Sequence, residues 1–99
     1  GRFPEARSTL EHAIAINPRD AVAHNYLGVC LAQLGSAQEA EKKLKTAIEI
    51  DPNYANAHFN LAVLYATIKP PDTDLARQHY KLATDLGAPP DTSLEQLIQ

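Results

Sequence analysis

The chain repeats itself at an offset of 34 residues. Asn17-Pro18 recurs as Asp51-Pro52, and His24 recurs at His58. Four small or apolar residues recur at the same offset: Ala6 at Ala40, Ala13 at Ala47, Ile16 at Ile50 and Leu27 at Leu61. Self-similarity at a fixed period of about 20–50 residues indicates an array of small units, each of which buries its apolar face against a neighbour. The repeat therefore predicts a stacked array rather than one closed core.

Apolar residues at intervals of three and four predict that these units are helical. In residues 4–16, Ala6, Leu10, Ala13 and Ile14 fall on one helical face. The same pattern predicts helices over 21–34, 37–50, 55–68 and 74–86. Prolines and glycines separate them, because a residue before proline leaves the α region and glycine commonly ends a helix. We expect an all-α chain without strands.

Residues 91–99 are predicted to form a short helix that covers the end of the array, as repeat proteins require for solubility. Thr92 and Glu95 have the spacing of a capping box, in which the first residue caps the helix. Leu94, Leu97 and Ile98 form one short apolar edge. We therefore expect Thr92 to cap the helix at its N-terminus and the three apolar residues to face the array.

The offsets divide the chain into four segments. Residues 1–20 hold the second helix of a truncated repeat, 21–54 a complete repeat, 55–90 a further repeat, and 91–99 the C-terminal capping helix. Three residues of the third segment match the second at an offset of 36: Ala76 with Ala40, Tyr80 with Leu44, and Ala83 with Ala47. Two residues are therefore inserted in the loop between its helices, where insertion costs little. Gly1 aligns with Gly35, so we expect the chain to be cut from a longer protein.

Composition argues against several classes of function. The net charge of −3 gives no reason to expect a nucleic-acid partner, which favours a basic face. No apolar run reaches the roughly 20 residues that cross a bilayer, so we expect no membrane insertion. The one cysteine, Cys30, excludes an internal disulfide, and we expect it to be a small buried side chain.

No constellation of residues predicts catalysis, a cofactor or a metal site. His24 and His58 occupy equivalent repeat positions, and packed helices lie about 10 Å apart, too far for the two imidazoles to share one ion. The four glycines lie at turns or packing positions and form no phosphate-binding loop. No serine, cysteine or histidine has the local context of a nucleophile.

These residues resemble the tetratricopeptide repeat, a helix–turn–helix unit of 34 residues. In the complete repeat the matching residues are Leu27, Gly28, Leu31, Gly35, Ala40, Leu44, Ala47 and Pro52. In the next repeat they are Leu61, Ala62, Tyr65, Ala76, Tyr80 and Ala83. The resemblance covers the chain apart from residues 91–99. It implies antiparallel helix–turn–helix repeats stacked as a right-handed α-solenoid.

The resemblance also implies a concave groove lined by the first helix of each repeat. In the complete repeat the groove positions are Val22, Asn25, Val29, Ala32 and Gln33. In the next repeat they are Asn56, Phe59, Val63, Ala66 and Thr67. None is charged, so the cationic clamp with which some family members grip a terminal carboxylate is missing. We expect the asparagines to hydrogen-bond an extended peptide, and Phe59 and Val63 to offer an apolar shelf.

The resemblance favours a non-catalytic scaffold that binds another protein or peptide. Two alternatives remain open: purely structural repeats that space or assemble neighbouring parts, and an accessory region of a larger enzyme. The groove residues are also compatible with partly buried structural positions without a ligand. Weak self-association is expected through the apolar face of the first helix, formed by Phe3, Leu10, Ala13 and Ile14. The sequence predicts no compartment.

Overall fold

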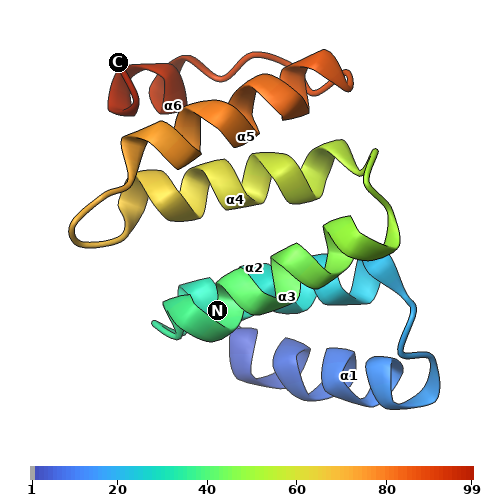
Figure 1. Cartoon of the computed structure of the whole chain (residues 1–99). Coiled ribbons are helices and arrows are strands. Elements are labelled where there is room, and N and C mark those ends of the chain that lie inside the picture. The colour runs from blue at the N-terminus through green and yellow to red at the C-terminus, as the bar shows by residue number, and fades with distance from the viewer. Residues whose placement is uncertain (1) are drawn as a thin grey trace. The chain divides into compact units, whose positions relative to one another are not determined.

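The computed structural model describes residues 2–99, and Figure 1 labels its helices. Over this range the six helices are α1 (Phe3–Ile16), α2 (Ala21–Gln33), α3 (Ala37–Ile50), α4 (Ala55–Thr67), α5 (Thr73–Asp85) and α6 (Thr92–Leu97). No strand occurs in the described residues, so the predicted all-α fold with five main helices and a short sixth is confirmed. Gly1, which the sequence aligns with Gly35, lies outside them.

The helices form two units. The first, residues 1–52, contains α1, α2 and α3, and the second, residues 53–99, contains α4, α5 and α6. Each unit has an antiparallel helix pair, α2 with α3 and α4 with α5 (Figure 1). Residues 34–36 join the first pair and residues 68–72 join the second. The second loop is the longer one, and it lies where the sequence offset changes.

Two proline-containing turns have the same backbone form. Asn17, which follows α1, has φ −134° and ψ 92°. Asp51, which follows α3, has φ −133° and ψ 92°. Both residues are extended because a following proline disfavours the α conformation. The predicted helix ends before Pro18 and Pro52 are therefore confirmed.

Glycines in the left-handed region end α2 and α5. Gly35 has φ 85° and Gly87 has φ 107°. After Gly35, the Ser36 N–H donates to the Leu31 carbonyl at 2.8 Å, and after Gly87 the Ala88 N–H donates to the Ala83 carbonyl at 2.9 Å. These bonds are those of the Schellman motif, which satisfies carbonyls that the helix leaves without partners.

Aspartates cap three helices at their N-termini. The Asp20 side chain accepts from the Ala23 N–H at 3.0 Å, and Asp72 accepts from the Leu75 N–H at 3.1 Å. Asp91 accepts from the Leu94 N–H at 2.9 Å, so Asp91 caps α6. The predicted capping box at Thr92 is wrong, because the Asp91 carboxylate already reaches the third helical amide and Thr92 becomes the first helical residue.

Gly28 allows α2 and α3 to pack closely. A Cβ added to Gly28 would lie 2.6 Å from Leu44 Cγ and 3.2 Å from the Ala40 carbonyl oxygen. Leu44 is 1% exposed, and Ala40 and Ala47 are fully buried. Leu34, which follows the last residue of α2, is 39% exposed and takes no part in this packing.

The C-terminal helix is hydrogen-bonded to α5 and also contacts α4. The Tyr80 hydroxyl donates to Glu95 Oε2 at 2.5 Å and accepts from the Asp91 N–H at 3.0 Å. The hydrogen bond to Glu95 raises the pKa of Tyr80 above its usual value, because it stabilises the neutral phenol. Arg77 Nε donates to the Ile98 carbonyl at 2.6 Å. These contacts tie both ends of α6 to one helix.

The apolar edge of α6 is narrower than predicted. Leu94 and Ile98 are buried, whereas Leu97 is 56% exposed. Residues one apart in a helix do not share a face, so Ile98 and Leu97 point in different directions. The expectation that Leu97 faces the array is wrong.

Candidate functional site

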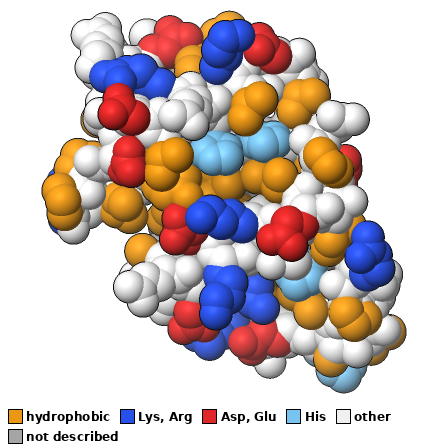
Figure 2. Space-filling model, viewed as in Figure 1, with side chains coloured by type: hydrophobic (Ala, Val, Ile, Leu, Met, Phe, Trp, Pro, Cys, Tyr) orange, Lys and Arg blue, Asp and Glu red, His pale blue; other side chains and the backbone are white. Residues whose placement is uncertain are grey.

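The helices α2 and α4 contain no Asp, Glu, Lys or Arg among their thirteen residues each. The charged residues of the helical pairs lie instead on α3 and α5. On the face shown in Figure 2, Lys and Arg side chains are interspersed with Asp and Glu, so this view of the described residues contains no extended basic patch. The first helix of each pair therefore carries no charged side chain.

On α2 the predicted groove residues are exposed to very different extents. Val22 is 51% exposed, Gln33 is exposed, and Val29 and Ala32 are half-buried. Asn25 is only 1% exposed, so the expectation that it hydrogen-bonds a ligand is corrected. Asn25 precedes Gly28 by three residues and therefore falls on the tightly packed side of α2.

Tyr26 is the residue of α2 that the sequence analysis missed. Its side chain is 50% exposed. Tyr26 lies four residues after Val22 and three before Val29, and such spacing places the three side chains on one face of the helix. The spacing of four and three residues between Val22, Tyr26 and Val29 could have identified this face from the sequence.

On α4 the predicted residues also share one face. Asn56 and Thr67 are exposed, Phe59 and Val63 are half-buried, and Ala66 is nearly buried. The Thr67 hydroxyl donates to the Val63 carbonyl at 2.8 Å, which occupies its one proton. Asn56, Phe59 and Val63 therefore form the accessible part of this set. The residues of α2 and α4 belong to different units, and each set is a surface of its own unit.

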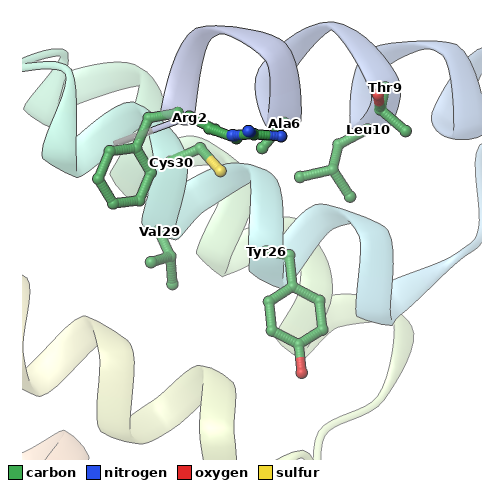
Figure 3. A pocket seen from close by; sticks show the side chains of 8 residues that line it. Arg2, Ala6, Thr9, Leu10, Tyr26, Val29 and Cys30 are labelled. Carbon is green, nitrogen blue, oxygen red and sulfur yellow. The ribbon is translucent and has the colours of Figure 1, made fainter.

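A groove of about 560 Å³ lies between α1 and α2 in the first unit (Figure 3). Its described lining residues are Arg2, Phe3, Ala6, Thr9 and Leu10 on one side and Tyr26, Val29 and Cys30 on the other. In Figure 3, Leu10 and the Cys30 sulfur extend toward each other across this space, with the Arg2 side chain beside Ala6. Arg2 is the one charged residue in this set. The groove is almost wholly apolar.

Two family models, each described as tetratricopeptide repeat, match the chain over residues 1–55 and 43–83. The chain belongs to the tetratricopeptide repeat family. Such repeats are generally non-catalytic protein–protein interaction modules. A search of curated proteins gave no match. In the described part of this tetratricopeptide chain, no helix is both long enough and apolar enough to traverse a bilayer.

The equivalent histidines of the two tetratricopeptide units have different neighbours. His24 Nε2 donates to the Pro18 carbonyl at 2.9 Å, and its Nδ1 is buried without a hydrogen-bond partner among the described residues. His58 Nδ1 lies 3.1 Å from His79 Nδ1, and their rings stack with centroids 5.4 Å apart. At the offset of 36 residues, Lys43 stands in place of His79. That difference leaves His24 without the second imidazole.

The histidine pair of the second unit is a contact that the sequence analysis did not predict. His79 also stacks on Tyr65, with ring centroids 5.7 Å apart. Among residues 2–99, no group of three or more His, Cys, Asp or Glu side chains is arranged to hold a metal ion. The geometry at His58 and His79 is that of packed aromatic rings joined by one hydrogen bond between imidazoles.

Proposed function

We propose that this chain is a non-catalytic interaction segment that binds a neutral or mildly apolar peptide or helix of another protein. The single observation that supports the proposal is that α2 and α4 lack charged residues while presenting accessible apolar side chains. Val22 and Tyr26 are about half exposed on α2. An uncharged surface favours a neutral ligand, because a charged group would lose hydration there without gaining an ionic partner.

Phe59 is the proposed anchor of the surface on α4. Its ring is half-buried, so its orientation is restrained before a ligand arrives. Aromatic side chains bury a large apolar area and dominate many interfaces, and a preformed anchor loses little entropy on binding. Asn56 is exposed three residues earlier and offers a hydrogen-bonding group beside the ring. Together they fit a peptide with one apolar side chain and a neighbouring backbone amide.

Replacing Phe59 with alanine is expected to weaken peptide binding by about 1 kcal/mol or more, as at other aromatic hot spots. A peptide selected from a random displayed library against the whole chain serves as the probe, and isothermal titration calorimetry measures its affinity. Val22→Asp provides a second variant at an exposed position, where the core is not disturbed. We expect it to weaken a peptide that contacts α2, because it places a charge on the neutral surface.

Lys42→Ala is the matched control, because Lys42 is exposed on the charged helix α3. We expect it to leave the affinity unchanged. Circular dichroism of each variant verifies that the helices are intact. A selected peptide whose affinity falls with Lys42→Ala and ignores both Phe59→Ala and Val22→Asp would place the binding surface on the charged side. The proposal would then be abandoned.

We also propose weak self-association through the apolar face of α1. Phe3 is 37% exposed, and Leu10, Ala13 and Ile14 are half-buried. Partly exposed apolar side chains in one stripe favour a contact between copies. Analytical ultracentrifugation over a wide concentration range is expected to show a rising average mass, and Phe3→Ser is expected to reduce it. A constant monomer mass at the highest concentration would contradict this expectation.

A further inference from the structure

We propose that His58 of α4 and His79 of α5 form an acid-sensitive contact, which stabilises the second unit at neutral pH and weakens when both imidazoles are protonated. The proposal concerns regulation of the fold and does not depend on the peptide surface described above. It rests on the atoms through which the two rings meet, on the burial of His58, and on the contacts that the carboxylates of this unit already make.

The two imidazoles meet through the same atom of each ring. His58 Nδ1 lies 3.1 Å from His79 Nδ1, which is a hydrogen-bond distance. A hydrogen bond between two imidazole nitrogens needs one N–H donor and one nitrogen with an available lone pair. When both rings are protonated, both Nδ1 atoms carry hydrogen and neither can accept. The contact therefore tolerates one proton between the facing nitrogens but not two.

The position of His58 makes a second proton costly. His58 is 6% exposed, so water has little access to replace the lost acceptor. It also lies in the first turn of α4, where the helix dipole disfavours a positive charge. His79 is half-buried and stacks on Tyr65, which restrains the other side of the contact. To separate two facing N–H groups, one ring would have to leave its packed position.

The charged groups of the two facing helices are already paired. The helix α4 carries no Asp, Glu, Lys or Arg. On α5, Asp74 pairs with Arg77 at 2.9 Å. Asp85 pairs with Lys81 on the same helix, also at 2.9 Å. A carboxylate of α5 that compensated a second imidazolium would therefore be drawn away from one of these ion pairs.

The other acidic groups of residues 53–99 hold the ends of helices. The Asp72 and Asp91 carboxylates accept from backbone N–H groups at the starts of α5 and α6. Glu95 of α6 accepts from the Tyr80 hydroxyl. The remaining cation of this range, Lys69, lies in the loop between α4 and α5, and the tyrosines are neutral below about pH 8. Within residues 53–99, compensating a second positive charge on the histidine pair therefore draws on a carboxylate that already has a partner.

The direction of the pH effect follows from the number of protons that each state binds. Imidazoles of an unfolded chain take up protons near about pH 6.5. Below this pH the unfolded chain binds a proton at both histidines, whereas the folded unit resists the second one. Because the unfolded state binds more protons, the free energy of unfolding falls as the pH falls. Carboxylates of ordinary affinity protonate below about pH 5, so the interval from about pH 6.5 to about pH 5 separates the histidines from them.

Hydrogen exchange of the whole chain, measured by mass spectrometry, tests the contact. Protection of the α4 and α5 amides is compared at about pH 7.5 and about pH 5.5, after correction for the intrinsic exchange rate at each pH. One proton excluded from the folded unit lowers the folding equilibrium about tenfold for each pH unit below about 6.5. We therefore expect about tenfold less protection of α4 and α5 at the lower pH. Unchanged protection of these helices would overturn the proposal.

His79→Asn removes the second titrating group and keeps a hydrogen-bonding partner. An amide donates through its N–H or accepts through its carbonyl, so it can pair with His58 in either protonation state. We expect the loss of protection in α4 and α5 to shrink to less than about threefold. His12→Asn, at an exposed position of α1, is the matched control and is expected to keep the tenfold loss. An equal loss in the native chain and in His79→Asn would contradict the proposal.

NMR of the imidazole nitrogens of the native chain provides a second readout, which does not require that His79→Asn folds. At about pH 7.5, we expect Nδ1 of one ring of the pair to carry hydrogen and Nδ1 of the other ring to accept. At lower pH, we expect protonation of both rings to coincide with the loss of protection in α4 and α5. If both rings are protonated while these helices keep their full protection, the contact is not acid-sensitive and the proposal fails.

Discussion

Replacing Leu44 with alanine is expected to lower the free energy of unfolding by about 2–5 kcal/mol, because it removes a buried side chain and leaves a cavity. Leu44 is 1% exposed and packs against Gly28. The matched control is Leu10→Ala, at the equivalent position of α1, where the side chain is only half-buried. We expect a clearly smaller loss there. Urea unfolding followed by circular dichroism measures both, and equal losses would contradict the packing described for α2 and α3.

Substituting Gly28 tests the same contact from α2. In the native chain, Gly28→Ala places a Cβ 2.6 Å from Leu44 Cγ and is expected to destabilise. In the Leu44→Ala background the two nearest obstructing atoms, Leu44 Cγ and Cδ2, are gone and only the Ala40 carbonyl oxygen remains, at 3.2 Å. Alanine also gains about 1 kcal/mol of helix propensity over glycine. Gly28→Ala should then be clearly less destabilising than in the native chain. Simple additivity of the two substitutions would show that the residues do not contact each other.

Ala47→Leu is expected to destabilise the chain by about 1–3 kcal/mol, because Ala47 is fully buried and the larger side chain overpacks the interface. Ala13 stands at the equivalent position of α1 but is half-buried. Ala13→Leu is therefore the control, and we expect a smaller effect from it. Thermal unfolding compares the two variants. An unchanged midpoint for Ala47→Leu would mean that this residue does not lie at a tight contact.

The helices themselves could be predicted from the sequence because their signals are local. A three- and four-residue apolar spacing places residues on one face, and proline or glycine ends each helix through its own backbone restriction. The predicted range 37–50 is that of α3, and the other main helices agree to within one residue at each end. The error at Thr92 has a local cause as well. Aspartate and threonine are both good caps, and only the backbone geometry selects Asp91.

The properties of the candidate surfaces were harder to predict because they depend on packing. The repeat pattern identified which residues of α2 and α4 are uncharged, but it did not reveal that Asn25 is buried and Tyr26 exposed. That distinction depends on how closely α3 approaches α2. The contact of His58 with His79 likewise joins residues 21 positions apart on facing helices. The groove between α1 and α2 could not be predicted from the apolar pattern of either helix, because it depends on how the two helices are placed relative to each other.

The buried thiol of Cys30 allows local opening of the first unit to be followed as a rate of alkylation by an added reagent. Cys30 is 6% exposed, and burial raises the pKa of its thiol, so little reactive thiolate is available in the folded chain. Alkylation is then expected to proceed chiefly when the helices around Cys30 open locally. Because the chain has one cysteine, every modified molecule records such an event at the same place. At fixed pH, the rate of Cys30 alkylation is therefore expected to report the free energy of local opening around this residue.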